Sequence, residues 1–169
     1  MSRRAEIVRA AERLLEEHGA EALTMRRLGE ELGMRAPSLY KHIAGKGDLV
    51  TALQGRALLL QAEAMAGALT LADLAGAYRA WACAHPRLYE LVARHPLDRA
   101  ALPPGAESAA AGPLLRAVGG DVDRARAVWA VAHGLVDLEL AGRLPADADL
   151  DAAWAAAVAA FTAAAGTAR

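Results

Sequence analysis

The sequence predicts an all-α protein of about nine helices. Alanine, the strongest helix former, supplies 45 of the 169 residues, whereas aromatic residues make up only 4%. Apolar residues recur at spacings of three and four along the chain, and no segment shows the alternating pattern of a strand. A chain of this length can bury a core of useful size, either as one domain or as a small domain joined to a larger one.

The N-terminal part begins and ends with helices that have clear boundaries. Ser2 can cap a first helix, and Gly19 can end it. A fourth helix is expected to begin near Asp48 and to run to Leu60 or beyond, which would link this part of the chain to the rest.

Residues 24–43 show the pattern of two short helices joined by a tight turn. Thr24 can cap the first helix, and Gly33 can end it by taking the positive φ of a helix C-terminus. Met34 supplies an apolar side chain between the helices, and Pro37 falls in the first turn of the second helix, where its missing N–H costs nothing. The spacing therefore predicts a helix-turn-helix, a motif that binds DNA.

The second helix of this motif has side chains suited to DNA. Slender residues at its start let the backbone approach the floor of a groove, and polar residues at its end can bond to phosphate. The slender residues are Ala36, Ser38 and the aliphatic part of Arg35. The polar residues are Tyr40, Lys41 and His42.

The net charge of −1 excludes a large basic surface. Residues 1–56 have ten Arg and Lys against eight Asp and Glu, and residues 57–169 have nine against twelve. Any affinity for DNA must therefore come from a local cluster of basic side chains rather than from the charge of the whole protein. The candidates are Arg26, Arg27, Arg35, Lys41 and Lys46.

The segment LYKHIAGKGDL resembles the signature of TetR-type transcriptional repressors, with a tyrosine, a histidine two residues later and a lysine four residues after that. Two positions depart from the family pattern. Ile43 stands where the family usually has phenylalanine, and Gly47 where it usually has an acidic residue. Ile43 can still fill a core position, and Asp48 can supply the negative charge favoured at a helix N-terminus.

The resemblance implies a three-helix DNA-binding domain over residues 1–60 and a helical regulatory and dimerisation domain over residues 61–169. It also implies a homodimer that binds a double-stranded DNA operator and takes no cofactor. The DNA-binding residues it implies are Thr24, Arg26, Arg35, Ala36, Ser38, Tyr40, His42 and Lys46.

These residues also have plainer explanations. Tyr40 could be a core aromatic residue and His42 a surface histidine. Their combination with Lys46 and the preceding turn favours DNA binding. Arginines on a helix are more often solvated than bound to bases, so Arg26 as a major-groove contact depends mainly on the resemblance.

The second half is expected to be helical with one long loop. Thr70 and Asp73 resemble a capping box that opens a helix, and His85 with Pro86 stops it. Further helices are expected over residues 87–94, 122–141 and 150–165, the last two capped by Asp121 and Asp149, with a loop over residues 96–113.

Aromatic and histidine residues in this half resemble a WHG subgroup of TetR-type C-terminal domains, named for a tryptophan followed by a histidine-glycine pair. The residues concerned are Trp81, His85, Tyr89, Trp129 and His133. They could bind a small, mainly apolar effector, or they could fill the core. For Trp129 and His133, which are four residues apart on one helix face, a structural role is the better interpretation.

The last two helices are expected to form the dimer interface. In the final helix one apolar stripe is assigned to the subunit's own core, and alanines on other faces would permit close approach of a partner helix. The stripe consists of Leu150, Trp154, Val158 and Phe161, and the alanines are Ala153, Ala156, Ala160 and Ala163. Alternatively, an alanine-coated helix can lie in water at little cost.

Several classes of protein are disfavoured. The single cysteine, Cys83, cannot form an intramolecular disulfide, and no Cys/His spacing suggests a metal site. No apolar run has the length of a signal peptide or membrane span, so a cytoplasmic protein that does not enter membranes is expected. His133 and Asp137, the nearest approach to a catalytic pair, have no nucleophile within a helical turn, which argues against an enzyme.

Two functions remain open. The first is a ligand-responsive, dimeric repressor in which an effector changes the spacing of two DNA-binding motifs. The second is a non-allosteric DNA-binding or interaction protein whose C-terminal region only dimerises.

Overall fold

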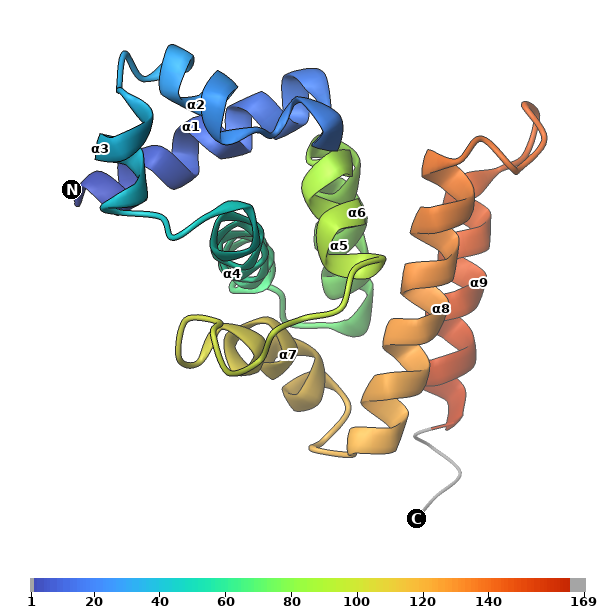
Figure 1. Ribbon diagram of the computed structural model, residues 1–169. Helices are drawn as coiled ribbons and strands as arrows, with labels where there is room; N and C mark the ends of the chain where they lie inside the picture. The colour runs from blue at the N-terminus through green and yellow to red at the C-terminus, as the bar shows by residue number, and fades with distance from the viewer. Residues whose placement is uncertain (1, 165–169) are drawn as a thin grey trace. The chain divides into compact units, whose positions relative to one another are not determined.

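A computed structural model describes residues 2–164 and confirms the all-α prediction (Figure 1). Within these residues there are nine α-helices and a single 3-10 turn, Ala20–Ala22. The helices are α1 (Arg3–His18), α2 (Met25–Glu31), α3 (Ala36–Tyr40), α4 (Lys46–Met65), α5 (Leu71–Ala84), α6 (Pro86–Ala93), α7 (Ala106–Ala117), α8 (Val122–Leu140) and α9 (Leu150–Ala164).

The chain forms two compact units. The first unit contains the chain up to Leu60 together with His85–Glu107, and the second contains Gln61–Ala84 and the chain from Ser108 onward. The division into domains at residue 60 stays a prediction. The compact units differ from it by adding α6 and the segment after it to the first unit.

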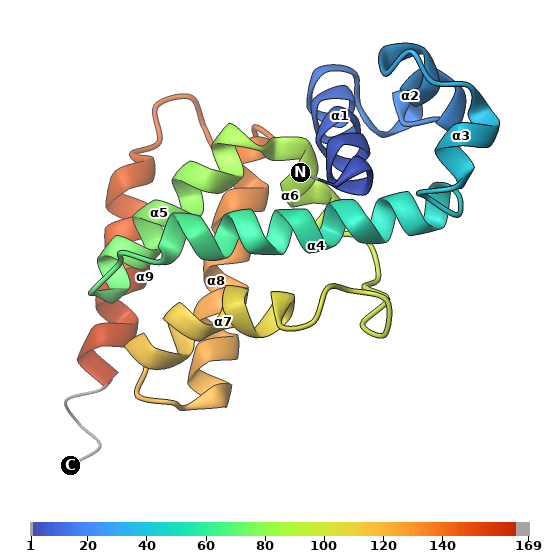
Figure 2. The same ribbon diagram turned by 90° about the vertical axis from the view of Figure 1, so that its left-hand side faces the viewer.

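The core of the first unit is built mostly from apolar side chains on its helices. Its largest fully buried side chains are Ile7, Leu15, Leu23, Leu28, Leu39, Ile43, Leu49, Leu53, Gln54 and Leu88. Figure 2 shows α4 along its length, with α1, α2 and α3 near the end where it begins. Ile43 is completely buried, so it does fill the core position expected for a phenylalanine.

Helix α6 is held at both ends by polar side chains of the first unit. At its start, the Glu16 carboxylate accepts hydrogen bonds from the backbone N–H groups of Leu88 and Arg87. At its end, the buried Gln54 amide donates to the carbonyls of Leu91 and Pro96, each at 3.2 Å. These bonds explain why α6 belongs to the same unit as α1.

In the second unit α5, α8 and α9 pack against one another. Arg79 of α5 joins all three helices, with its guanidinium 2.9 Å from the Glu139 carboxylate of α8 and 2.5 Å from the Asp151 carboxylate of α9. The same guanidinium lies 5.9 Å from the centre of the Trp154 ring. Because these two carboxylates bond to it, the pKa of Arg79 is raised above its usual value.

Helix α7 corrects the prediction of a loop over residues 96–113. The helix begins at Ala106 and contains Pro113 in its interior, although proline removes a backbone hydrogen bond there. Alanines on either side favour a helix, and Ala106, Ala110 and Val118 are buried. Burial of this face outweighs the local effect of proline.

The predicted helix caps are confirmed. Thr70 and Asp73 form the reciprocal pair of a capping box, with each side chain accepting from the other residue's backbone N–H. Ser2, Asp121 and Asp149 each accept a hydrogen bond from a backbone N–H of the helix that follows. In the described part of the chain, no helix is both long enough and apolar enough to cross a membrane.

Candidate nucleic-acid interface

The first helix of the motif, α2, is capped by Thr24 as predicted. This residue has extended backbone angles, and its hydroxyl accepts a hydrogen bond from the Arg27 N–H at 3.2 Å. Leu28 is completely buried, whereas Arg26 is exposed. The cap and the buried leucine therefore orient α2 so that Arg26 faces outward.

The turn between α2 and α3 is closed by a glycine pair. Gly33 has φ 61°, and the Met34 N–H donates to the Gly29 carbonyl at 2.8 Å, the hydrogen bond of a Schellman motif. A Cβ on Gly29 would lie 2.9 Å from the Met34 carbonyl oxygen, so the turn needs glycine at this position. Sequence reasoning identified Gly33 and missed Gly29, because Gly29 has no special φ and its constraint is a contact across the turn.

Helix α3 is anchored on one side and open on the other. Leu39 is completely buried, and it is the only buried residue of this five-residue helix. Arg35 precedes the helix with extended angles, and Pro37 lies in its first turn as predicted. The remaining side chains of α3 are exposed, so the helix presents a free surface.

Every residue that the resemblance assigns to DNA binding is exposed. They are Thr24, Arg26, Arg35, Ala36, Ser38, Tyr40, His42 and Lys46. The Tyr40 side chain is 51% exposed, so the alternative that it fills the core is wrong. Arg26, Arg35, Ala36 and Tyr40 also line one hollow in the surface between α2 and α3.

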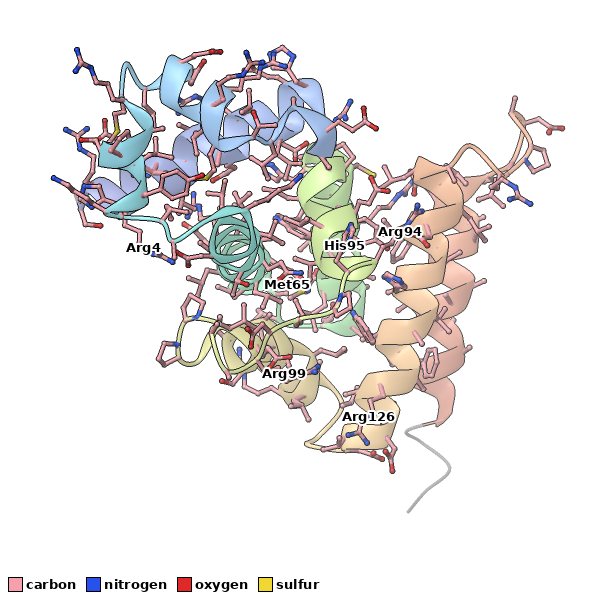
Figure 3. The ribbon with its side chains drawn as sticks, viewed as in Figure 1. Arg4, Met65, Arg94, His95, Arg99 and Arg126 are labelled. Atoms are coloured by element: carbon pink, nitrogen blue, oxygen red, sulfur yellow. The ribbon has the colours of Figure 1, made fainter. Side chains whose placement is uncertain are left out.

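The segment from α3 to α4 is fixed by a residue that sequence reasoning did not select. Arg4, in the first turn of α1, bonds to the Asp48 carboxylate and to the His42 carbonyl. Figure 3 labels Arg4. The guanidinium lowers the pKa of Asp48 to about 2. No local pattern connects Arg4 with Asp48, because 44 residues separate them.

The residues suggested for effector binding fall in both units. Trp81 is buried in the second unit, where Trp129, 50% exposed, stacks on His133 with ring centres 5.5 Å apart. In the first unit His85 precedes α6 and Tyr89 is buried. The stack is in keeping with the structural role favoured for Trp129 and His133, and effector binding stays a prediction. Residues 2–164 contain no cluster of three metal-ligating side chains.

The two faces of α9 differ in burial. Trp154 is buried, and the other members of its stripe, Leu150, Val158 and Phe161, are half-buried. Ala156 and Ala160 are exposed and Ala153 is half-buried, whereas the side chain of Ala163 lies outside the described part. Helix α8 likewise exposes large apolar side chains, namely Val122, Trp129, Val131, Leu138 and Leu140.

An exposed helix-turn-helix followed by a helical bundle defines a DNA-binding regulator of the helix-turn-helix class. Residues 7–53 match the model described as bacterial regulatory proteins of the tetR family. Residues 71–161 match a second model, described as a tetracyclin repressor-like C-terminal domain. The chain belongs to the TetR family of transcriptional regulators, which are DNA-binding proteins and not enzymes. The finer WHG assignment stays a prediction.

Similar proteins match either most of the chain or a shorter part of it. The chain is 33% identical over 164 residues to an uncharacterized HTH-type transcriptional regulator, Rv0681, of Mycobacterium tuberculosis, covering 88% of this chain and 75% of that protein. It is 47% identical over 47 residues to the class A tetracycline repressor of transposon 1721 from Escherichia coli, covering 28% of this chain and 22% of the repressor. A solved protein of unknown function from Rhodococcus sp. RHA1 has a TM-score of 0.79 at 27% identity, covering 95% of this chain and 94% of that one.

Proposed function

We propose that this protein is a repressor that binds a double-stranded DNA operator in the cytoplasm through α2, α3 and the start of α4. The observation that carries the proposal is the exposure of all eight predicted DNA-binding residues around a buried Leu39. In this arrangement Arg26, Ala36 and Ser38 contact base edges, and Tyr40 and Lys46 contact phosphates. Repression is the role named for the class A tetracycline repressor, to which the chain is similar over 47 residues.

We further propose that the protein acts as a homodimer through α8 and α9. Five large apolar side chains of α8 are exposed in the single chain, and α9 presents alanines such as Ala156 and Ala160 that allow close packing. Burial of such side chains against a second copy removes apolar surface from water, which favours association. A two-fold dimer presents two identical motifs about 34 Å apart, or a multiple of that, and so requires a pseudo-palindromic operator.

We also propose that the protein responds to a small apolar effector. In the second unit the candidate residues are Trp81, Trp129 and His133, whose rings supply apolar area and a polar group to orient a small molecule. If the protein responds to such a molecule, binding raises its melting temperature. A set of small apolar compounds that leaves the melting temperature unchanged favours the alternative, a regulator whose second unit only dimerises.

The decisive experiment is selection of genomic DNA fragments by the purified wild-type protein. Enrichment of a motif with two inverted half-sites supports the proposed function. If a DNA fragment with only one half-site binds with the same affinity, that result contradicts the proposal that the protein binds DNA as a homodimer. Recovery of fragments without any shared sequence contradicts operator binding.

A further inference from the structure

The start of α1 is bonded directly to the segment that carries His42. One Arg4 nitrogen, Nη1, donates to the His42 carbonyl at 2.7 Å and to Asp48 Oδ2 at 3.0 Å. The other, Nη2, donates to Asp48 Oδ1 at 2.5 Å, so the contact between guanidinium and carboxylate is bidentate. Figure 3 labels Arg4 beside the segment that joins α3 to α4.

Asp48 holds the same segment from the other side. Its Oδ2 accepts a hydrogen bond from the Ala44 N–H at 2.8 Å, and the residue lies in the first turn of α4. The backbone of residues 41–45 is therefore bonded at a carbonyl, His42, and at an N–H, Ala44, by two side chains that also bond to each other. Such a closed set of bonds restricts the segment far more than either side chain alone.

We propose that Arg4 and Asp48 are positioning residues that form a clamp, here called the Arg4–Asp48 clamp, and that the clamp holds residues 41–45 in the conformation that binds DNA. The inference rests on the proposed function, in which Tyr40 and Lys46 on either side of this segment contact phosphates. Hydrogen bonds to phosphate need their donors placed within a fraction of an ångström, which an unrestrained loop does not provide.

The clamp and a direct contact between Arg4 and a phosphate predict different results. The Arg4 charge is paired with the Asp48 carboxylate, and the guanidinium lowers the pKa of that carboxyl group to about 2. A direct contact predicts that removal of the neighbouring negative charge strengthens DNA binding, whereas the clamp predicts that it weakens binding. Lysine in place of Arg4 would keep a phosphate contact but could not form the bidentate pair.

The chain contains a matched control in a second ion pair between the same two helices. Arg56 Nε of α4 lies 3.1 Å from Glu12 Oε2 of α1, and both side chains are partly buried. Arg56 lies eight residues beyond Asp48, roughly 12 Å along the helix, and so away from residues 41–45. Variants of this pair test whether a loss of contact between α1 and α4 is by itself enough to change DNA binding.

The first measurement is amide hydrogen exchange of the full-length protein without DNA. Arg4→Ala and Asp48→Asn are expected to speed exchange in residues 41–45, whereas Glu12→Gln is expected to leave that segment unchanged. Equal exchange in the wild type and both clamp variants would overturn the clamp, whatever the protein binds. Circular dichroism establishes that each variant is folded.

The second measurement is the affinity for a fluorescent duplex carrying the sequence that the wild-type protein selects from a random library. Arg4→Ala, Arg4→Lys and Asp48→Asn are each expected to weaken binding about tenfold with an unchanged salt slope, and the double variant Arg4→Ala/Asp48→Asn is expected to be no weaker than either single one. Glu12→Gln is expected to bind as the wild type does.

Three outcomes of this titration would overturn the clamp. One is normal or tighter binding by Asp48→Asn. Another is near-normal binding by Arg4→Lys together with a salt slope lowered by about 1 per protomer in Arg4→Ala, which would assign Arg4 to a phosphate. The third is an equal loss in Glu12→Gln. A wild-type protein that selects no sequence contradicts the proposed function instead, while the exchange measurement still decides whether the clamp exists.

Discussion

The Glu16 carboxylate of α1 accepts a hydrogen bond from the backbone N–H of Leu88 in the first turn of α6, with 2.9 Å between the two atoms. His85, which precedes α6, provides no side-chain cap of its own. The unpaired N–H groups of a helix start are favourable partners for a carboxylate, so Glu16 takes the place of the missing cap. This bond joins a helix of the predicted DNA-binding domain to one that lies 72 residues later.

We therefore expect Glu16→Ala to lower the free energy of unfolding by about 1 kcal/mol, the usual effect of removing a helix cap. Urea unfolding followed by circular dichroism measures the change. Glu17→Ala is the matched control, because its side chain is adjacent in sequence but exposed. Equal midpoints for the two variants would show that the bond to α6 contributes nothing to stability.

We expect Lys46→Ala to weaken binding to all DNA sequences by a similar factor. Lys46 is exposed at the first position of α4, where its ammonium group can reach a phosphate without contacting a base. Loss of one phosphate contact lowers the salt slope of binding by about 1 per protomer. Gel-shift titrations at several salt concentrations measure the slope, with Arg143→Ala as a control for the loss of one exposed charge in the second unit. An unchanged salt slope in Lys46→Ala would show that Lys46 does not contact a phosphate.

Arg26→Ala is expected to change sequence preference rather than overall affinity for DNA. A bidentate contact between arginine and guanine provides roughly 1 to 3 kcal/mol of discrimination against other bases. The variant should therefore tolerate any base at one position of each half-site. Selection from a random library compares the variant with the wild type. Recovery of the same motif at the same stringency would show that Arg26 is a solvated arginine.

Local chemistry was sufficient to predict most elements of the fold, α7 excepted, whereas contacts between distant segments were not predictable. Thr24 caps its helix as expected because the cap involves only the next three residues. Residues 106–113 were expected to be part of a loop, but they belong to α7, because burial of residues such as Ala106 and Ala110 outweighs the local effect of Pro113. Arg4 and Glu16 show no pattern in sequence that indicates their partners, which lie 44 and 72 residues away.

The stability contributed by Asp48 is expected to depend on pH. Its pKa in the folded protein is lowered from 3.8 to about 2, chiefly by the hydrogen bond with Arg4. A carboxyl group whose pKa is lower in the folded than in the unfolded protein stabilises the folded state fully at pH values above its unfolded pKa. This contribution is lost as the pH falls from about 4 to about 2. The difference in urea midpoint between wild type and Asp48→Asn should thus be largest near neutral pH and shrink toward pH 3.

The Arg4→Ala background provides the control for this pH effect. Without the guanidinium, the main cause of the lowered pKa is gone, so Asp48→Asn should change the urea midpoint less at every pH. A difference between wild type and Asp48→Asn that stays constant from pH 7 to pH 3 would contradict an ionised Asp48 as the stabilising group.

Ala156→Glu and Ala160→Glu are expected to convert the protein from a dimer to a monomer. Both alanines are exposed on α9, on the side away from the buried Trp154. At a two-fold interface each substitution places two unpaired carboxylates where partner helices meet, at a cost on the order of several kcal/mol per dimer. The monomers should retain their helix content but bind a palindromic operator weakly, because each molecule then presents one motif.

Sedimentation velocity at micromolar concentration measures the oligomeric state directly. Ala72→Glu is a suitable control, since Ala72 is exposed in the first turn of α5, where a glutamate suits the helix dipole. If α9 instead faces water, both substitutions should leave the oligomeric state unchanged, because alanine-rich helices tolerate solvent and a surface glutamate changes little. A wild-type protein that sediments as a monomer, or a dimer that withstands both α9 substitutions, would therefore exclude this helix from the interface.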